Sequence, residues 1–241
     1  MLRLTVKDFG LALSVPVIWG MGFTFAKAGL NEFPPLFLMS LRFSLSALIL
    51  CWFYPPPIEQ FKVIFLLALV SATIQYGLTF TGLMGLDAST AVLLVPLEVP
   101  FGALLASIIL KDNLGWIRAL GMVVVFFGVG LIAGAPSIRN HIIEHGQLES
   151  IKNATIIGWG TVIYLCVIMT TVGYGIWYHI LKKYDVNQVM PFLLLLPVSS
   201  IIGAVLFLEE RPNPTTIIGG SIVIIGVAII VFAGQWMASK E

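Results

Sequence analysis

Long hydrophobic stretches alternate with short polar segments along the whole chain. A helix needs about 20 apolar residues to cross a bilayer. Eight stretches meet this length, near residues 9–29, 34–54, 63–85, 88–110, 116–135, 157–181, 187–208 and 216–235. The loops inside helix pairs are very short, so neighbouring helices are expected to run antiparallel. The pattern predicts an all-α, polytopic membrane protein with about eight transmembrane helices.

Composition supports the same class and removes others. Apolar residues make up 59% of the chain and charged residues 10%, whereas soluble domains have roughly 45–50% and 25%. A net charge of +1 gives no basis for binding nucleic acid. The two cysteines, Cys51 and Cys166, both lie in hydrophobic stretches, so no disulfide framework is predicted. The expected surroundings are a lipid bilayer. The first hydrophobic stretch is too long for a signal peptide and is expected to be a retained helix.

Lysine and arginine placement predicts the orientation. With the N-terminus inside, eight basic residues lie on the inner side and three on the outer side. The inner set is Arg3, Lys7, Lys62, Lys111, Arg118, Lys182, Lys183 and Lys240, and the outer set is Arg139, Lys152 and Arg211. Basic residues favour the cytoplasmic side, so both termini are predicted to be cytoplasmic.

The chain also repeats itself. A shift of 98 positions places Tyr76-Gly77 on Tyr174-Gly175 and Gly121 on Gly219. The stretches 63–85 and 157–181 are an odd number of helices apart, so they cross the membrane in opposite senses and the repeat is inverted. Inverted repeats in transporters frame a site near the midplane and permit alternating access. The second copy lacks counterparts of the first two stretches.

Three charged residues lie inside predicted helices: Lys27, Arg42 and Glu98. Such residues are costly in a membrane and often functional. Lys27 is near the outer end of its helix and could extend to the interface. Arg42 and Glu98 lie about 12 Å and about 15 Å below the outer ends of their helices, at 1.5 Å per residue. These similar depths make an ion pair between them feasible.

Each of the two deep charges has two interpretations. Arg42 is either a structural residue that holds carbonyls or a neighbouring helix, or part of the functional site. Glu98 is either a satisfied structural partner or a ligand, which would bind a substrate ammonium group or carry a coupling proton.

Prolines flank the same region in both copies. Pro96 and Pro100 lie on either side of Glu98, and Pro191 and Pro197 occupy the repeat-related helix. Proline frees backbone carbonyls and bends a helix, and freed backbone in a membrane must be buried or line water. Both pairs therefore indicate one central cavity, although a packing kink would also account for them.

Aromatic and small residues suggest how the cavity is lined and how the helices pack. An amphipathic solute needs aromatic faces with a few polar groups, although single aromatic residues often only pack or face lipid. The candidate substrate-binding residues are Trp19, Gln75, Tyr76, Glu98, Tyr174 and Trp177. Glycines such as Gly121, Gly128, Gly219 and Gly226 predict close helix packing, within the chain or at the interface of a homodimer.

One motif resembles a catalytic one. Residues His141 to His145 fit H-x-x-E-H, a zinc-protease pattern. The motif lies in a loop of about 20 residues without a catalytic domain around it, so no metal site and no enzymatic activity are predicted.

Several motifs, in order, carry a family resemblance. The first part has Ile18-Trp19-Gly20, Lys27-Ala28-Gly29-Leu30, Pro34-Pro35 and Leu41-Arg42-Phe43. The last part has Gly173-Tyr174-Gly175-Ile176-Trp177, Val189-Met190-Pro191-Phe192, Leu195-Leu196-Pro197-Val198 and Leu208-Glu209-Glu210-Arg211. Together they resemble the EamA-type drug/metabolite transporters, and within that family the chain is most similar to the O-acetylserine/cysteine exporter group.

The resemblance implies an exporter of small amino-acid-like metabolites in the inner (plasma) membrane, without a cofactor. It also implies a fold of ten helices in two inverted five-helix repeats. Here the first repeat would cover residues 1–137, an outer loop 138–156, and an incomplete second repeat of three helices 157–241. The missing helix pair would fall near 136–145, which preserves the direction of every later helix. The alternative is a truncated relative that does not transport and acts as a structural or interaction protein, or a deletion product.

Overall fold

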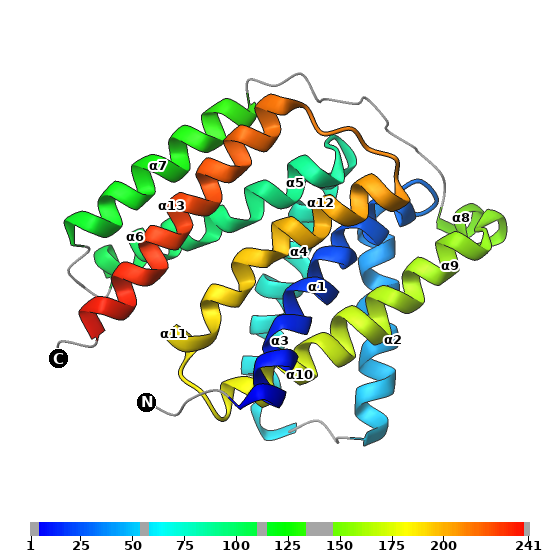
Figure 1. Cartoon of the computed structure of the whole chain (residues 1–241). Helices are drawn as coiled ribbons and strands as arrows, with labels where there is room; N and C mark the ends of the chain where they lie inside the picture. Colours follow the sequence, from blue (N-terminus) through cyan, green and yellow to red (C-terminus); the bar gives the residue numbers. More distant parts are fainter. Residues whose placement is uncertain (1–4, 54–57, 110–114, 134–146, 239–241) are drawn as a thin grey trace.

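The computed structural model describes residues 5–53, 58–109, 115–133 and 147–238 (Figure 1), and all its regular elements there are helical. The first half contains α1 (Val6–Gly29), α2 (Pro35–Phe53), η1 (Ile58–Gln60), α3 (Phe61–Ala68), η2 (Leu69–Gln75), α4 (Tyr76–Met84), α5 (Ala88–Leu94), η3 (Val95–Leu97), α6 (Glu98–Ile109) and α7 (Trp116–Ala133). The second half contains α8 (Gln147–Asn153), α9 (Ile156–Ile163), η4 (Tyr164–Gly173), α10 (Tyr174–Leu181), α11 (Val186–Val189), η5 (Met190–Leu195), α12 (Leu196–Phe207) and α13 (Pro214–Ala238).

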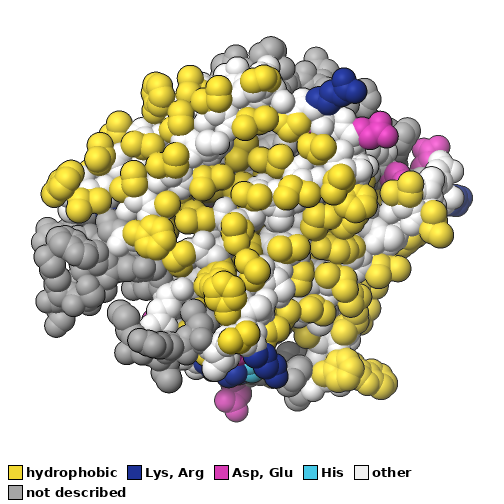
Figure 2. All heavy atoms as spheres, in the orientation of Figure 1, with side chains coloured by type: hydrophobic (Ala, Val, Ile, Leu, Met, Phe, Trp, Pro, Cys, Tyr) yellow, Lys and Arg dark blue, Asp and Glu magenta, His cyan; other side chains and the backbone are white. Residues whose placement is uncertain are grey.

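The prediction of an all-α polytopic membrane protein is confirmed. Within the described ranges, seven continuous helical runs are long and apolar enough to cross a membrane. The remaining predicted stretch, 116–135, forms a shorter apolar helix, Trp116–Ile132. The short helix α8 lies inside the segment that was expected to be an outer loop. Figure 2 shows hydrophobic side chains spread over the middle of one face, with charged side chains gathered toward two opposite ends, as a bilayer requires.

The irregular segments recur at repeat-related positions. Two helical runs contain π-helical turns, η2 and η4, and these end immediately before Tyr76 and Tyr174. Two others contain 3₁₀ segments, η3 and η5, which carry Pro96 and Pro191 in their first turns. Proline lacks the N–H donor that an α-helix needs, and π turns often mark functional sites. The repeat is therefore present in the backbone as well as in the sequence.

The last helices of the two repeats, α7 and α13, lie side by side (Figure 1). A Cβ atom on Gly121 would lie 2.9 Å from the carbonyl oxygen of Gly226, and one on Gly128 would lie 2.8 Å from that of Gly219. Between these two contacts the residue number rises along α7 and falls along α13, so the two helices are antiparallel. A shift of 98 positions converts Gly121 into Gly219 and Gly128 into Gly226, so it converts each contact into the other. The two helices are therefore related by a local two-fold axis. The glycine rows pack within the chain.

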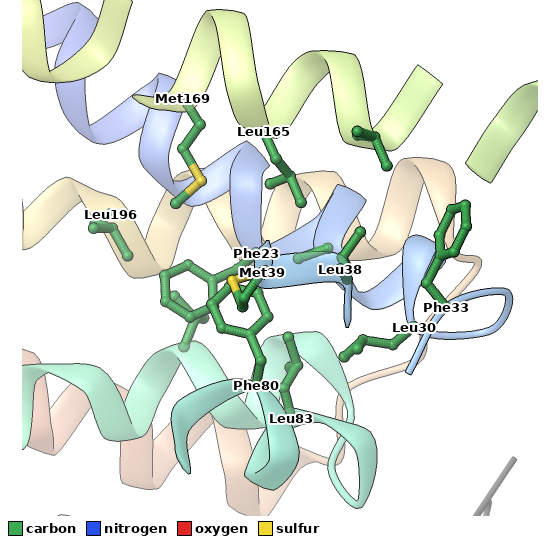
Figure 3. Close-up of a cluster of buried hydrophobic side chains, with 13 residues drawn as sticks. Phe23, Leu30, Phe33, Leu38, Met39, Phe80, Leu83, Leu165, Met169 and Leu196 are labelled. Atoms are coloured by element: carbon green, nitrogen blue, oxygen red, sulfur yellow. The ribbon is translucent and has the colours of Figure 1, made fainter. Parts of the chain in front are cut away.

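A hydrophobic cluster joins the two repeats (Figure 3). Phe23 of α1 and Phe80 of α4 stack with ring centroids 6.1 Å apart. Leu165 and Met169 of η4 and Leu196 of α12 complete the cluster from the second repeat. Burial of these side chains fixes α1 between the two halves.

Polar clamps secure the helix ends. The Lys27 ammonium group donates to the carbonyl oxygens of Leu83 (2.8 Å) and Met84 (3.0 Å), so it caps the C-terminus of α4 and does not extend to the interface as expected. At the same end of the molecule, Glu210 accepts hydrogen bonds from the backbone of Ala88 and Ser89 at the start of α5. Carboxylates are favourable at a helix N-terminus.

A second clamp lies at the opposite end, where α1 begins. The Asp8 carboxylate forms an ion pair with Lys183 at 3.3 Å and accepts a hydrogen bond of 2.8 Å from the Tyr184 hydroxyl. Asp8 belongs to the first repeat, and both of its partners belong to the second. The two repeats are therefore held together by polar contacts at both ends.

The glycine packing gives a testable expectation. The substitution Gly128→Ala places a methyl group against the Gly219 carbonyl and forces α7 and α13 apart, and overpacking of this kind costs about 1–3 kcal/mol. Thermal unfolding in detergent is expected to show a lower midpoint. The control is Gly130→Ala on the same helix, where a Cβ would have nothing within 4 Å. Equal midpoints for both variants would contradict the packing assigned here.

Candidate functional site: a cavity between the repeats

One cavity of about 630 Å³ lies between the two halves of the molecule. This volume is within the range of about 300–1,000 Å³ that is typical of small-molecule sites. Its wall combines residues of α1, η2, α4, α5, η3, α6, η4, α10, η5, α12 and α13. Most of the lining is aliphatic or aromatic, and its side chains with a polar group are those of Trp19, Gln75, Tyr76, Thr79, Glu98 and Tyr174. The cavity thus combines apolar walls with a few polar groups.

Five of the six residues selected from sequence as substrate-binding line this cavity: Trp19, Gln75, Tyr76, Glu98 and Tyr174. Trp177 is the exception. It is buried in a separate cluster and packs against Trp19 with ring centroids 5.8 Å apart. The turn of α10 directs it behind the wall, so it supports Trp19 and does not line the cavity.

Tyr76 and Tyr174 meet across the cavity wall, and their hydroxyl oxygens are 2.5 Å apart. They are 98 positions apart, so the repeat exchanges one for the other and the hydrogen bond lies on the local two-fold axis. The neighbouring rings repeat the pattern, since Tyr76 stacks on Phe80 at 6.0 Å and Tyr174 stacks on Tyr178 at 6.1 Å. The centre of the site is therefore built from both repeats in the same way.

Arg42 lies behind this tyrosine pair and is fully buried. Its Nε donates to the Thr170 hydroxyl at 2.8 Å, and its guanidinium carbon lies 4.9 Å and 5.0 Å from the ring centroids of Phe43 and Tyr76. Cation–π contacts of this kind stabilise a desolvated charge by about 2 kcal/mol or more. Among the described residues the only ion pair is Lys183–Asp8, so the ion pair with Glu98 that depth allowed does not form.

Glu98 begins α6 directly after the 3₁₀ segment η3, and its exposed side chain faces the cavity. Within the described ranges, no hydrogen bond or ion pair involves its carboxylate. An unpaired carboxylate inside a membrane span is costly and is usually functional. Glu98 is therefore available to a cationic group that enters the cavity.

The prolines divide between wall and support. Pro96 and Pro197 line the cavity, whereas Pro100 is buried and Pro191 lies outside the lining. The expectation that both pairs mark one cavity thus applies to one member of each pair.

Sequence reasoning missed several lining residues. Thr79 follows Gln75 by four positions and so shares its helix face, a spacing that could have identified it. Met190, Val227 and Val231 also line the cavity, but nothing in their local sequence distinguishes them from packing residues. The H-x-x-E-H motif at 141–145 lies outside the described residues. In the part of the chain that the structure describes, no three His, Cys, Asp or Glu residues are grouped to hold a metal ion.

The Arg42 anchor can be tested through its partner. The substitution Thr170→Val removes the acceptor of the buried Nε–H group, and an unsatisfied buried group of this kind costs about 1–3 kcal/mol. Unfolding in a denaturing detergent is expected to show this loss. Thr171→Val is the matched control, because the Thr171 hydroxyl bonds only the Cys166 carbonyl in its own helix. A loss of the same size in both variants would show that Arg42 does not depend on Thr170.

Comparisons with curated proteins agree with this architecture. The chain is 26% identical to a protein named "Probable amino-acid metabolite efflux pump" from Escherichia coli (strain K12), over 95% of this chain and 96% of that protein. It is 24% identical to a protein of the same name from Salmonella typhimurium, over 94% and 95%. An "Uncharacterized transporter" from Archaeoglobus fulgidus is 22% identical over 92% and 97%.

The alignment with the Escherichia coli pump spans 288 positions, which exceeds the 241 residues of the chain by 47. At least that many positions of the alignment therefore have no residue in this chain. No solved structure gives a significant match. The model of the EamA-like transporter family matches residues 9–134 and again residues 143–232. These two matches cover most of the chain, which therefore belongs to the EamA-like transporter family.

Proposed function

We propose that this membrane transporter exports small amino-acid-like metabolites, and that the substrate binds in the cavity between the repeats. The observation that carries the proposal is the unpaired carboxylate of Glu98 in a cavity with mainly apolar walls. A metabolite with an ammonium group and an apolar part fits this combination. The names of the Escherichia coli and Salmonella typhimurium relatives support the same substrate class.

Each lining residue has a proposed role. Glu98 binds the ammonium group of the substrate. The hydroxyls of Tyr76 and Tyr174 and the amide of Gln75 supply further hydrogen bonds. The ring of Trp19, held from behind by Trp177, contacts the apolar part.

The proposed mechanism is alternating access, and the inverted repeat supports it. The repeats would rock about the axis through the Tyr76–Tyr174 contact and open the cavity to one side at a time. The clamp between Glu210 and Ser89 and the clamp between Asp8 and Lys183 join different repeats at opposite ends. In the proposed cycle, each clamp forms when its own side is closed.

We also propose a location in the inner (plasma) membrane with both termini in the cytoplasm, which rests on the lysine and arginine bias. A homodimer stays a prediction. The glycine rows of α7 and α13 contact each other inside the chain, so a dimer would use another surface.

The role of Glu98 predicts a loss of export. In cells that express this chain, the substitution Glu98→Gln is expected to lower efflux of labelled cysteine or O-acetylserine about tenfold or more. The reason is that a hydrogen bond to a charged group contributes roughly 1.5–3 kcal/mol, and 1.4 kcal/mol corresponds to about tenfold.

The control is Glu59→Gln, because Glu59 is exposed in η1 and lies outside the cavity. Both variants should reach the membrane in equal amounts by immunoblot. Unchanged export by Glu98→Gln would remove Glu98 from the mechanism.

One observation favours a second candidate, a relative that does not transport alone. The alignment positions without a residue in this chain are numerous enough for two transmembrane helices. Under this candidate, the chain alone shows no efflux, and a variant with two hydrophobic stretches of the Escherichia coli pump inserted between α7 and α9 shows efflux. Equal efflux by both would contradict it.

A further inference from the structure

In the part of the chain that the structure describes, one face of the inverted repeat lacks the helices that cover its counterpart. Helices of the first repeat cover the second, since α1 packs along α12 and both α1 and α2 pack along η4. A shift of 98 positions relates α12 to α6 and the end of η4 to the end of η2. In the described residues, the main neighbours of α6 are η3, α7 and α13, and those of η2 are α3 and α4. Within the residues that the structure describes, no helix lies over α6 and η2 as α1 and α2 lie over α12 and η4.

Burial shows the same difference. In the run Ile156–Leu181 of the second repeat, 39% of the residues are buried, against 11% in the related run Ile58–Met84. Individual pairs agree. Gly203 lies against Met21 and Thr24 of α1, whereas its counterpart Leu105 is 55% exposed.

This open face, which we define by η2, α4 and α6, carries polar groups that lipid would not satisfy. Gln75 and Glu98 are both exposed there. Their counterparts in the second repeat are Gly173 and Leu196, which lie against Trp19 and Gly20 of α1. Polar groups that face hydrocarbon are costly. The cost falls if a helix covers this face as α1 covers its counterpart.

We propose that the open face binds an antiparallel pair of transmembrane helices supplied by another polypeptide. The two spans would need about 20 residues each, and the 47 surplus positions of the alignment with the Escherichia coli pump equal this number with a turn. The inverted repeat requires the first helix of the pair to run opposite to α1. A second copy in the same orientation would present its α1 in the wrong sense, and its α1 already packs on its own α12.

The pair would complete the cavity on the side opposite Trp19. Its first helix would lie over Gln75 and Glu98. In the second repeat, α1 lies in the same way over Gly173 and Leu196. The inference uses the cavity to which we assign transport, but its test measures contact and not export.

In the experiment, the full chain is co-expressed with a tagged fragment of the Escherichia coli pump, chosen as two consecutive hydrophobic stretches that align with no residue of this chain. The photo-reactive amino acid benzoylphenylalanine replaces Leu105 in one variant and Ile108 in another. Ile108 is the matched control on the same helix, because it is 65% exposed and its counterpart Leu206 is also exposed, at 68%.

The proposal expects the fragment to co-purify with the chain in mild detergent and to cross-link to position 105 at least fivefold more than to position 108. Cross-links from position 105 to a second copy of the chain would overturn it in favour of a homodimer. Cross-links to lipid alone, without co-purification, would overturn it in favour of a lipid-facing surface. Each of these outcomes can be interpreted even if the export experiments fail, because cross-linking and co-purification measure contact and not export.

Discussion

The membrane requires every backbone polar group to find a partner inside the protein, and the rest of this structure depends on that constraint. It accounts for the entirely helical character of the described elements. It also limits where the helices can depart from α geometry. Of the five irregular segments in the described residues, four contribute residues to the cavity wall, namely η2, η3, η4 and η5. Because freed carbonyls must be buried or line a cavity, these four segments lie at the site.

A charged side chain inside the membrane is also costly, and this cost is met differently at the two deep charges. Arg42 is desolvated but is accommodated by two aromatic rings and one hydroxyl. Glu98 is left without a partner in the described structure and faces a space large enough for a ligand. The difference separates a charge that holds helices together from a charge that is free to bind. Tyr76 connects Arg42 to the cavity. Its ring contacts the Arg42 guanidinium group, and its hydroxyl forms a hydrogen bond with that of Tyr174.

Much of the fold could be predicted from the sequence, because hydrophobic stretches of bilayer length and a repeat at a fixed offset survive in the amino-acid order. Most of the polar wall was also predictable, since glutamine, tyrosine and glutamate are unusual inside such stretches. The partners of these residues were not. Depth along a helix placed Arg42 and Glu98 at one level, but it carries no information about the direction in which each helix face points. Rotation about the helix axis likewise placed Trp177 behind the wall.

The unequal repeats have a consequence for the energy of the two conformations of a transporter. If the repeats were identical, exchanging their conformations would convert one end state into the other, and the two would be equally populated. In the described part of this chain α1 and α2 cover one repeat without counterparts on the other, so the two end states of the proposed cycle would bury different surfaces. The two states would then differ in free energy, and the ratio of their populations changes tenfold for each 1.4 kcal/mol of that difference. The resting direction of the cavity is thus a property of the asymmetry of the chain.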